Sequence, residues 1–270
     1  MLTIEGVKKT FHPGTPHEVR ALDGVSLTIE PGSFVVVIGT NGSGKSTLLS
    51  AVAGSIPVDE GRIVVDGVNV TKWPDHRRAK LVGRVFQNPF AGTAPSMTVA
   101  ENLSLAAKRG RARGLGWALN AGVKREIRER ISRLGMQLED RIDNPIGTLS
   151  GGQRQALTLL MASWSKPRLL LLDEHTAALD PKSADQVIRL SEEIVKRDRL
   201  TTMMVTHSMQ QAAKLGDRLV MMHRGVAIHD FSGAEKARLR PQDLLARFEE
   251  IRRADLLDQS AAAMLSRTYV

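Results

Sequence analysis

The spacing of hydrophobic residues changes several times along the chain, and each change predicts a different element. Leu2–Val7, Val25–Ile29 and the glycine-bounded Gly61–Gly67 are short β-rich runs that predict an antiparallel sheet. Phe34–Ile38 and Leu169–Leu172 are continuous apolar runs, which are typical of strands buried on both faces of a parallel sheet. The mixture of these strands with helical segments predicts an α/β fold.

Helical spacing of apolar residues appears between the strands. Lys45–Ala53 predicts a helix that ends at Gly54, a residue suited to a left-handed cap. Val99–Lys108 predicts a second helix and Lys124–Leu138 a third, whose apolar residues share one face. The remaining expectations are a surface connection over Thr71–Ala79, strands over Leu81–Gln87 and Leu200–Thr206, a hairpin over Arg218–Asp230 and a charged amphipathic helix over Pro241–Leu257.

A glycine-rich loop joins the strand Phe34–Ile38 to the helix Lys45–Ala53. Its sequence fits G-x-x-x-x-G-K-[ST], and its members are Gly39, Thr40, Asn41, Gly42, Ser43, Gly44, Lys45, Ser46 and Thr47. Such a loop points backbone N–H groups into one concavity at the positive end of a helix dipole, which suits a polyphosphate. The motif predicts that Lys45 reaches the β and γ phosphates and that Ser46 binds Mg²⁺. The alternative is a simple turn between strand and helix.

Composition restricts the possible classes of protein. The 270 residues are enough for one compact domain with an inserted subdomain. No apolar run approaches the ~18 residues that cross a bilayer, and Met1–Thr10 lacks the pattern of a secretory signal, so we expect a soluble or peripheral protein. The absence of cysteine excludes disulfides and thiol chemistry. The net charge of +9 is compatible with ATP, nucleic acid or an anionic membrane surface.

A second candidate anion site begins at the segment Leu149–Gln153. Ser150 and Gln153 have the spacing of a capping box, so a helix is expected to start there. Gly151 and Gly152 lower the stability of a first helical turn. Their presence therefore indicates a site at which unshielded backbone N–H groups approach an anion closely.

Polar residues end two further apolar strands. Asp173 and Glu174 follow Leu169–Leu172, and His207 follows Leu200–Thr206. Because ligands bind at the carboxyl ends of strands in α/β folds, we expect these residues to converge on the phosphate loop, with Asp173 holding hydrated Mg²⁺ and Glu174 polarising water. The alternatives are an N-cap made by the acids and a structural histidine.

Two single residues are weaker candidates. Phe11, just after the first strand, could stack on an adenine ring, with a buried core phenylalanine as the equal alternative. Gln87, at the end of its strand, could bind a metal through its carbonyl oxygen, or be only solvated.

Residues 108–133 form a basic stretch with nine basic and two acidic side chains. One interpretation is a solvated face with ion pairs such as Arg125 with Glu129 and Glu126 with Arg130. The other is a surface that lies against anionic lipid headgroups or the loops of a membrane partner. Nucleic acid is less favoured because no aromatic residues lie between the charges.

Together these motifs resemble the nucleotide-binding subunit of an ABC transporter over residues 2–230. The resemblance rests on the phosphate loop, Gln87, the signature Leu149–Gln153, the acidic strand Leu169–Glu174, the D-loop Ala177–Asp180 and the switch His207. It implies a P-loop NTPase fold with a mostly parallel RecA-like sheet, an antiparallel β subdomain and an inserted helical subdomain at about 89–165. The expected domain spans 2–240, followed by a helical tail at 241–270.

The resemblance also implies roles and partners. Phe11 stacks on adenine, Gln87 completes the Mg²⁺ coordination, Glu174 is the catalytic base and His207 contacts the γ-phosphate. Two copies bind two ATP head to tail, so that five residues act in trans: Ser150, Gly151, Gly152, Gln153 and Asp180. The expected partners are separate membrane permease subunits and an extracytoplasmic substrate-binding protein, with no nucleic acid, and the expected location is peripheral at the cytoplasmic face of the membrane.

Two departures and one alternative function complete the interpretation. His175 stands where the family usually has proline, and Ala177 where it usually has serine. The segment 173–180 resembles a subgroup that is paired with periplasmic binding proteins and implies uptake of amino acids such as tryptophan or tyrosine. The alternative is a soluble ABC ATPase that acts on nucleic acid or ribosomes, although such proteins usually carry two nucleotide domains or a coiled-coil insertion.

Overall fold

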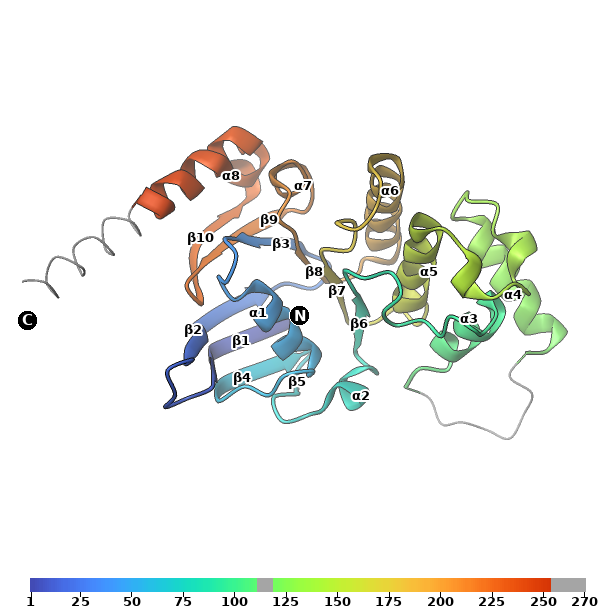
Figure 1. Ribbon diagram of the computed structural model, residues 1–270, viewed down its shortest axis with the longest axis horizontal. Helices are drawn as coiled ribbons and strands as arrows, with labels where there is room; N and C mark the ends of the chain where they lie inside the picture. The colour runs from blue at the N-terminus through green and yellow to red at the C-terminus, as the bar shows by residue number, and fades with distance from the viewer. Residues whose placement is uncertain (111–118, 254–270) are drawn as a thin grey trace, which may run out of the picture.

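The computed structural model describes residues 1–110 and 119–253. Part of the predicted basic loop, including Arg111 and Arg113, and the end of the predicted tail lie outside the described residues. The described part of the chain is elongated, with the strands at one end and three helices at the other (Figure 1). These helices are α3 (Val99–Ala107), α4 (Ala121–Ser132) and α5 (Gly151–Ser163).

A six-stranded sheet forms the centre of the strand-rich end. Its order is β10-β9-β3-β8-β7-β6, and only β10 is antiparallel to its neighbour. The strands are β3 (Phe34–Gly39), β6 (Val82–Val85), β7 (Leu169–Asp173), β8 (Thr202–Val205), β9 (Arg218–His223) and β10 (Val226–Ser232). The predicted parallel core and the hairpin after it are confirmed, while β6 ends before Gln87 and leaves that residue in a loop.

A four-stranded antiparallel sheet lies beside it, in the order β2-β1-β4-β5. The strands are β1 (Leu2–Phe11), β2 (Val19–Ile29), β4 (Glu60–Val65) and β5 (Val68–Asn69). The predicted antiparallel sheet is therefore confirmed, but its first two strands are longer than their apolar patterns suggested. Phe11 is the last residue of β1, paired with Val19 of β2, and does not follow the strand as expected.

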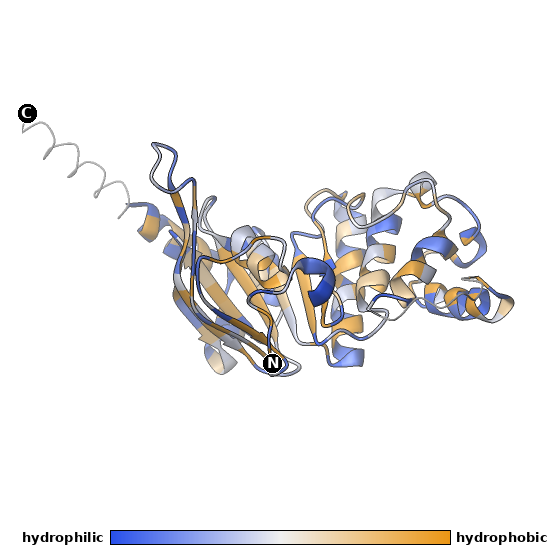
Figure 2. Ribbon diagram, turned by 90° about the horizontal axis from the view of Figure 1, so that it is seen from below, coloured by the Kyte–Doolittle hydropathy of each residue, from blue (hydrophilic) through white to orange (hydrophobic). Residues whose placement is uncertain are grey.

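Alternate residues of the central strands face two hydrophobic cores. Val35 and Val37 of β3 pack with α1 (Lys45–Ala53) and the antiparallel sheet, whereas Val36 and Ile38 belong to the core that includes α5. Most of the length of the strands is consequently coloured as hydrophobic in Figure 2. This two-sided burial explains why β3 and β7 were recognisable as continuous apolar runs.

The helix predictions were correct in kind but not always in extent. α1 has the predicted bounds, and Gly54 caps it with φ 84°. α4 begins earlier than predicted because the Asn120 side chain accepts a hydrogen bond from Val123 N–H, and it ends at Ser132, since Gly135 turns the chain with φ 63°. The four apolar residues that predicted this helix, Ile127, Ile131, Leu134 and Leu138, are all buried.

The predicted surface connection over Thr71–Ala79 was wrong in one respect. It contains the short helix α2 (Asp75–Arg78), and Arg78 is 1% exposed. The Arg78 guanidinium donates to four carbonyls, those of Ala51, Val52, Thr71 and Trp73. Arginine can be buried here because its planar fork donates to two carbonyls in the last turn of α1 and to two in the segment before α2.

The last helices pack against the central sheet, and three of them share the hydrophobic core that contains α5. These last helices are α6 (Pro181–Asp198), α7 (Met209–Lys214), α8 (Gly233–Arg238) and a helix at 241–253. Leu244 and Phe248 anchor this last helix in the core. None of the helices in the described ranges combines the length and apolar character that a membrane span needs.

Candidate active site

The loop between β3 and α1 has a backbone that requires glycine. Gly42 and Gly44 have φ values of 76° and 95°, a region that residues with a Cβ rarely adopt. A Cβ on Gly39 would lie 2.3 Å from the Met222 carbonyl oxygen. No described side chain caps the N-terminus of α1, so its first N–H groups are available to an anion at the positive end of the helix dipole.

Lys45 lies inside this loop. Its Nζ donates to the carbonyls of Gly39 and Thr40 at 2.8 and 2.9 Å, and the residue is 7% exposed. Burial lowers the pKa of Lys45 below its usual 10.5, and the Glu174 carboxylate acts in the opposite direction. The loop therefore holds a buried cation within electrostatic range of Glu174, an arrangement that suits a phosphate.

Gln87, Glu174 and His207 come together from three different strand ends. Gln87 Nε2 donates to Glu174 Oε2 at 3.3 Å, and His207 Nδ1 lies 3.2 Å from the same oxygen. Glu174 has φ 42°, and its N–H is fixed by the Val205 carbonyl of β8 at 2.9 Å. A left-handed backbone at a residue other than glycine costs about 1 kcal/mol or more and is often found at functional sites.

Arg84 is a site residue that the sequence did not reveal. Its Nη2 lies 2.9 Å from Asp173 Oδ2, and its guanidinium also donates to the hydroxyls of Ser50 and Ser55. Arg84 reaches Asp173 because β6 and β7 are neighbours in the sheet. The available signal was an arginine within an otherwise apolar strand, but the strand order needed to interpret it is not encoded locally.

The five residues predicted to act in trans form a separate group. Ser150 and Gln153 make the predicted capping box at the start of α5. Asp180 caps α6 through the N–H of Ser183, and its pKa is lowered by the hydrogen bonds from that residue. Among the described hydrogen bonds and ion pairs, none joins this group to the phosphate loop or to Glu174.

Gly152 has a packing role that the sequence did not indicate. A Cβ at this position would lie 2.7 Å from both Cβ and Oγ of Ser183. Gly151 is less constrained, since its Cβ would lie 3.4 Å from a methyl group of Leu179. Gly152 therefore serves close packing of α5 against the start of α6, and the predicted exposure of N–H groups to an anion stays a prediction for both glycines.

His175 is completely buried behind Glu174. Its Nε2 lies 2.9 Å from Ser191 Oγ, and the Ser191 hydroxyl donates to the Val187 carbonyl at 2.8 Å. Because that hydroxyl proton is already used, Nε2 must be the protonated nitrogen of His175. Nδ1 has no partner among the described atoms, and burial lowers the pKa of His175 to about 4, so this histidine is neutral at pH 7.

The remaining candidates are less constrained by the structure. Phe11 is half-buried, with Lys9 Nζ 5.7 Å from its ring centroid, and its contact with adenine stays a prediction.

In the basic stretch, the Glu126–Arg130 pair forms at 2.8 Å and Lys124 pairs with Asp143. The predicted pair of Arg125 with Glu129 is not among the ion pairs of the described residues. Two of the nine basic side chains, Lys124 and Arg130, are therefore paired within the described part of the chain.

A glycine loop around a buried lysine, together with two carboxylates at the end of a parallel strand, defines a P-loop NTPase. Residues 22–177 match the ABC transporter family. A tyrosine transport ATP-binding protein of Clostridioides difficile is 42% identical over 251 residues, which cover 92% of this chain and 99% of that protein. A lipoprotein-releasing system ATP-binding protein of Caulobacter vibrioides is 34% identical over 225 residues, or 82% of this chain and 92% of that protein.

Solved structures show the same fold. A dimeric ATP-binding cassette in a post-hydrolysis state, bound to ADP and Pi, superposes with a TM-score of 0.73 at 27% identity and covers 86% of this chain and 98% of that one. The chain belongs to the ABC transporter family as its ATP-binding subunit. It binds ATP and is an ATPase that powers transport, a class whose cassettes form dimers and work with membrane permease components.

Proposed function

We propose that this chain hydrolyses ATP at the phosphate loop to drive uptake of a solute through separate membrane permease subunits. The observation that carries the proposal is the convergence of Gln87 and His207 on one carboxylate oxygen of Glu174. A carboxylate held by two polar side chains near Lys45 is placed to orient and deprotonate a water molecule. Glu174 is therefore the proposed catalytic base, and His207 the proposed contact to the γ-phosphate.

The remaining residues would hold the nucleotide and its metal. Lys45 and the loop N–H groups would bind the phosphates, and Phe11 would stack on adenine. The hydroxyl of Ser46, the amide oxygen of Gln87 and, through water, the carboxylate of Asp173 are oxygen donors of the kind that Mg²⁺ prefers. No group of three His, Cys, Asp or Glu residues in the described ranges could hold an ion alone, which suits a metal that shares its coordination with substrate phosphates. Bound Mg²⁺ would neutralise phosphate charge as it develops.

A second copy of the chain would complete each site. The glycine pair and Asp180 lie at the starts of α5 and α6, which pack together, and no described hydrogen bond or ion pair joins them to the phosphate loop of their own chain. The similar cassette is dimeric when bound to ADP and Pi, which supports a dimer, and we propose that its two copies lie head to tail. In that arrangement Ser150, Gly151, Gly152 and Gln153 would bind the ATP held by the partner's phosphate loop.

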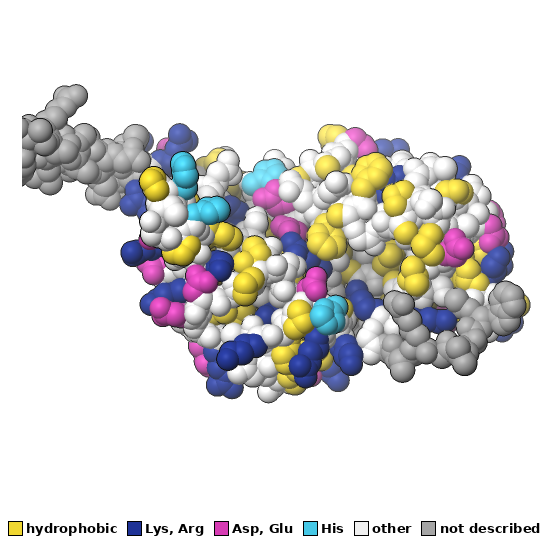
Figure 3. All heavy atoms as spheres, turned by 60° about the horizontal axis from the view of Figure 1, so that its bottom comes forward, with side chains coloured by type: hydrophobic (Ala, Val, Ile, Leu, Met, Phe, Trp, Pro, Cys, Tyr) yellow, Lys and Arg dark blue, Asp and Glu magenta, His cyan; other side chains and the backbone are white. Residues whose placement is uncertain are grey.

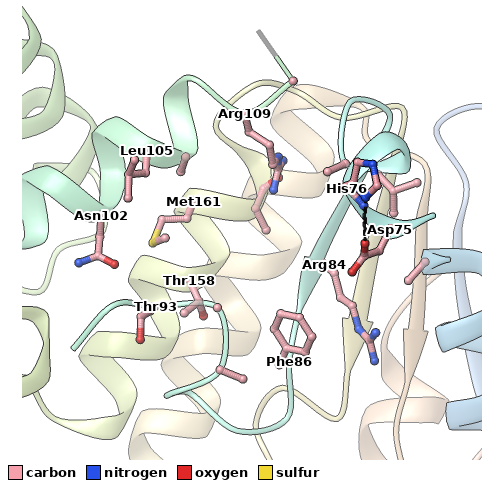
Figure 4. A pocket seen from close by; sticks show the side chains of 18 of the residues that line it. Asp75, His76, Arg84, Phe86, Thr93, Asn102, Leu105, Arg109, Thr158 and Met161 are labelled. Carbon is pink, nitrogen blue, oxygen red and sulfur yellow. Dashed lines mark hydrogen bonds and ion pairs between the residues drawn. The ribbon is translucent and has the colours of Figure 1, made fainter. Parts of the chain in front are cut away.

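A cavity beside Gln87 is the proposed docking site for a cytoplasmic loop of the permease. It has a volume of about 940 Å³ and lies between β6 and the helical end of the molecule. Figure 4 shows Phe86 and Arg84 on one side, with Leu105 of α3 and Met161 of α5 across from them. Leu105 is 49% exposed, and hydrophobic and basic side chains lie next to each other on the face shown in Figure 3. Such a mixed surface suits an amphipathic protein segment.

The nature of the solute and of the other partners is part of the same proposal. The similarity to a tyrosine transport ATP-binding protein supports an amino acid of the tyrosine or tryptophan kind, delivered by an extracytoplasmic substrate-binding protein. The lipoprotein-releasing relative shows that related chains serve other cargoes. In this arrangement the chain would lie at the cytoplasmic face of the membrane, bound through the permease.

The experiment compares Glu174→Gln with the wild-type protein and with Glu129→Gln, an exposed control on α4. Because the amide keeps the shape and loses the base, steady-state phosphate release should fall by at least about 100-fold, while ATP binding persists. Size-exclusion chromatography with light scattering should show an ATP-dependent dimer of the Glu174→Gln protein. Undiminished hydrolysis, or a strictly monomeric variant at saturating ATP, would contradict the proposal.

A further inference from the structure

The segment that carries Gln87 is held by the helix that begins with the glycine pair. Gln155 of α5 is fully buried, and its Nε2 donates to the carbonyl of Phe86 at 3.0 Å. The Thr158 hydroxyl donates to the Gln155 backbone carbonyl at 2.8 Å and lies 3.3 Å from the Gln155 side-chain oxygen. The residue immediately before Gln87 is therefore attached to the first turns of α5, although the two lie far apart in the sequence.

A second contact joins the same helix to the middle of this segment. The guanidinium of Arg154 lies 3.9 Å from the ring centroid of Phe90. Arg154 is 2% exposed, whereas Phe90 is 56% exposed. A guanidinium stacked on an aromatic ring and shielded from water makes a strong cation–π contact, so an exposed ring forms the outer cover of a buried cation.

Arg154 also holds the backbone in front of the glycine pair. Its Nη2 donates to the carbonyls of Gly147 and Leu149 at 2.7 and 3.2 Å. Its Nε and Nη1 are buried and have no hydrogen-bond partner among the described atoms. The orientation of the guanidinium is consequently set by two carbonyls on one side and the Phe90 ring on the other.

The far end of the segment is fixed more firmly. Asn102 of α3 accepts from the Ala94 N–H at 2.8 Å and donates to the carbonyls of Ala94, Met97 and Thr98. With Phe86 and Ala94 both anchored, displacement is confined to residues 87–93, which include Gln87 and Phe90.

We propose that Arg154 is a positioning residue, and that its stack with Phe90 transmits displacement of residues 87–93 to the backbone at 147–150. A change at Gln87 in one site would thereby alter how the glycine pair of the same chain meets the ATP of its partner. The inference rests on the proposed function, because it assumes that this pair acts in trans.

The contact should affect the assembly of the ATP-bound dimer and not the binding of nucleotide to one chain. Phe90 and Arg154 make no described contact with the phosphate loop, so binding to the monomer should be insensitive to either. Removing the ring leaves the guanidinium without one of its two supports, and removing the guanidinium releases the Gly147 and Leu149 carbonyls. Each change should raise the ATP concentration needed for dimerisation by about tenfold.

The test uses the Glu174→Gln protein as parent and adds Phe90→Ala, Arg154→Met and the double substitution. Phe90→Tyr, which keeps the ring, is the matched control, and Arg154→Lys keeps the charge without the planar fork. The measurements are the Kd for MgADP, the melting temperature and the ATP concentration at half-maximal dimerisation. We expect unchanged MgADP binding, normal dimerisation for Phe90→Tyr, and the tenfold shift for the other variants. The double variant should be no worse than the more affected single one, because the residues act as a unit.

Three results would overturn the inference. These are an unchanged half-maximal ATP concentration, additive effects in the double variant, or losses in MgADP binding and melting temperature as large as the loss in dimerisation. A parent that stays monomeric would overturn the proposed function and this inference with it, whereas a dimerising parent with unaffected variants would overturn this inference alone.

Discussion

The buried His175 predicts a specific loss of stability in mild acid. A second proton on this ring would have no acceptor among the described atoms. Nε2 already donates to Ser191, and Nδ1 is buried without a partner among those atoms. Protonation would place an unpaired positive charge in the core. Unfolding removes that penalty, so His175 binds a proton more readily in the unfolded chain than in the folded chain.

The magnitude follows from the two pKa values. The pKa of His175 is about 4 in the folded protein, against an ordinary value of 6.5 in the unfolded chain. Because the unfolded state binds more protons between these values, stability falls as pH decreases through this window and is unaffected above it. From pH 7.5 to pH 5 the free energy of unfolding should fall by about 2 kcal/mol from this residue alone.

The assay is urea unfolding of the nucleotide-free protein at pH 7.5 and pH 5, for the wild type and His175→Gln. Glutamine can keep an N–H donor toward Ser191 and does not titrate, so the variant should lose about 2 kcal/mol less than the wild type on acidification. His76→Gln is the control, because the His76 side chain is 80% exposed, and it should keep the wild-type dependence. Equal pH dependence of the wild type and His175→Gln would refute the reasoning.

Two further substitutions test the packing around the site. Gly152→Ala should destabilise the protein by about 1–3 kcal/mol, because the alanine Cβ would lie 2.7 Å from Ser183 Cβ. Thermal unfolding measures this change, and a variant as stable as the wild type would contradict the prediction. Arg78→Met should lower the free energy of unfolding by about 3 kcal/mol, because four carbonyls in the last turn of α1 and before α2 lose their hydrogen-bond donor. ATP binding should weaken as well. Arg77→Met on the exposed side of α2 is the control, and equal unfolding midpoints of the two variants would show that burial of Arg78 is unimportant.

The sequence by itself determined the features that depend on neighbouring residues. The phosphate loop, the helix that follows it, the left-handed cap at Gly54 and the capping box at Ser150 are all found where they were predicted. Each is specified by the conformational preferences and hydrogen-bonding groups of a few consecutive residues. The buried strands could be recognised for a similar reason, because burial on both faces leaves a continuous apolar run.

Helix ends were less predictable, since they depend on single local contacts that compete with the apolar pattern. In α4 the pattern continued to Leu138, but the helix ends at Ser132, and Leu134 and Leu138 reach the core from the segment that follows the helix. The apolar pattern therefore identified the buried residues correctly, while Gly135 and its neighbours determined the backbone conformation between them.

Only the tertiary structure decided which side chains meet. Strand order places Arg84 against Asp173, and the ends of separate elements bring Gln87 and His207 onto Glu174. Likewise, nothing near His175 in the sequence indicates that Ser191 will satisfy one ring nitrogen and burial will leave the other bare. These contacts join residues that are distant along the chain, so they exist only once the sheet has aligned its strands and the helices have packed on both of its faces.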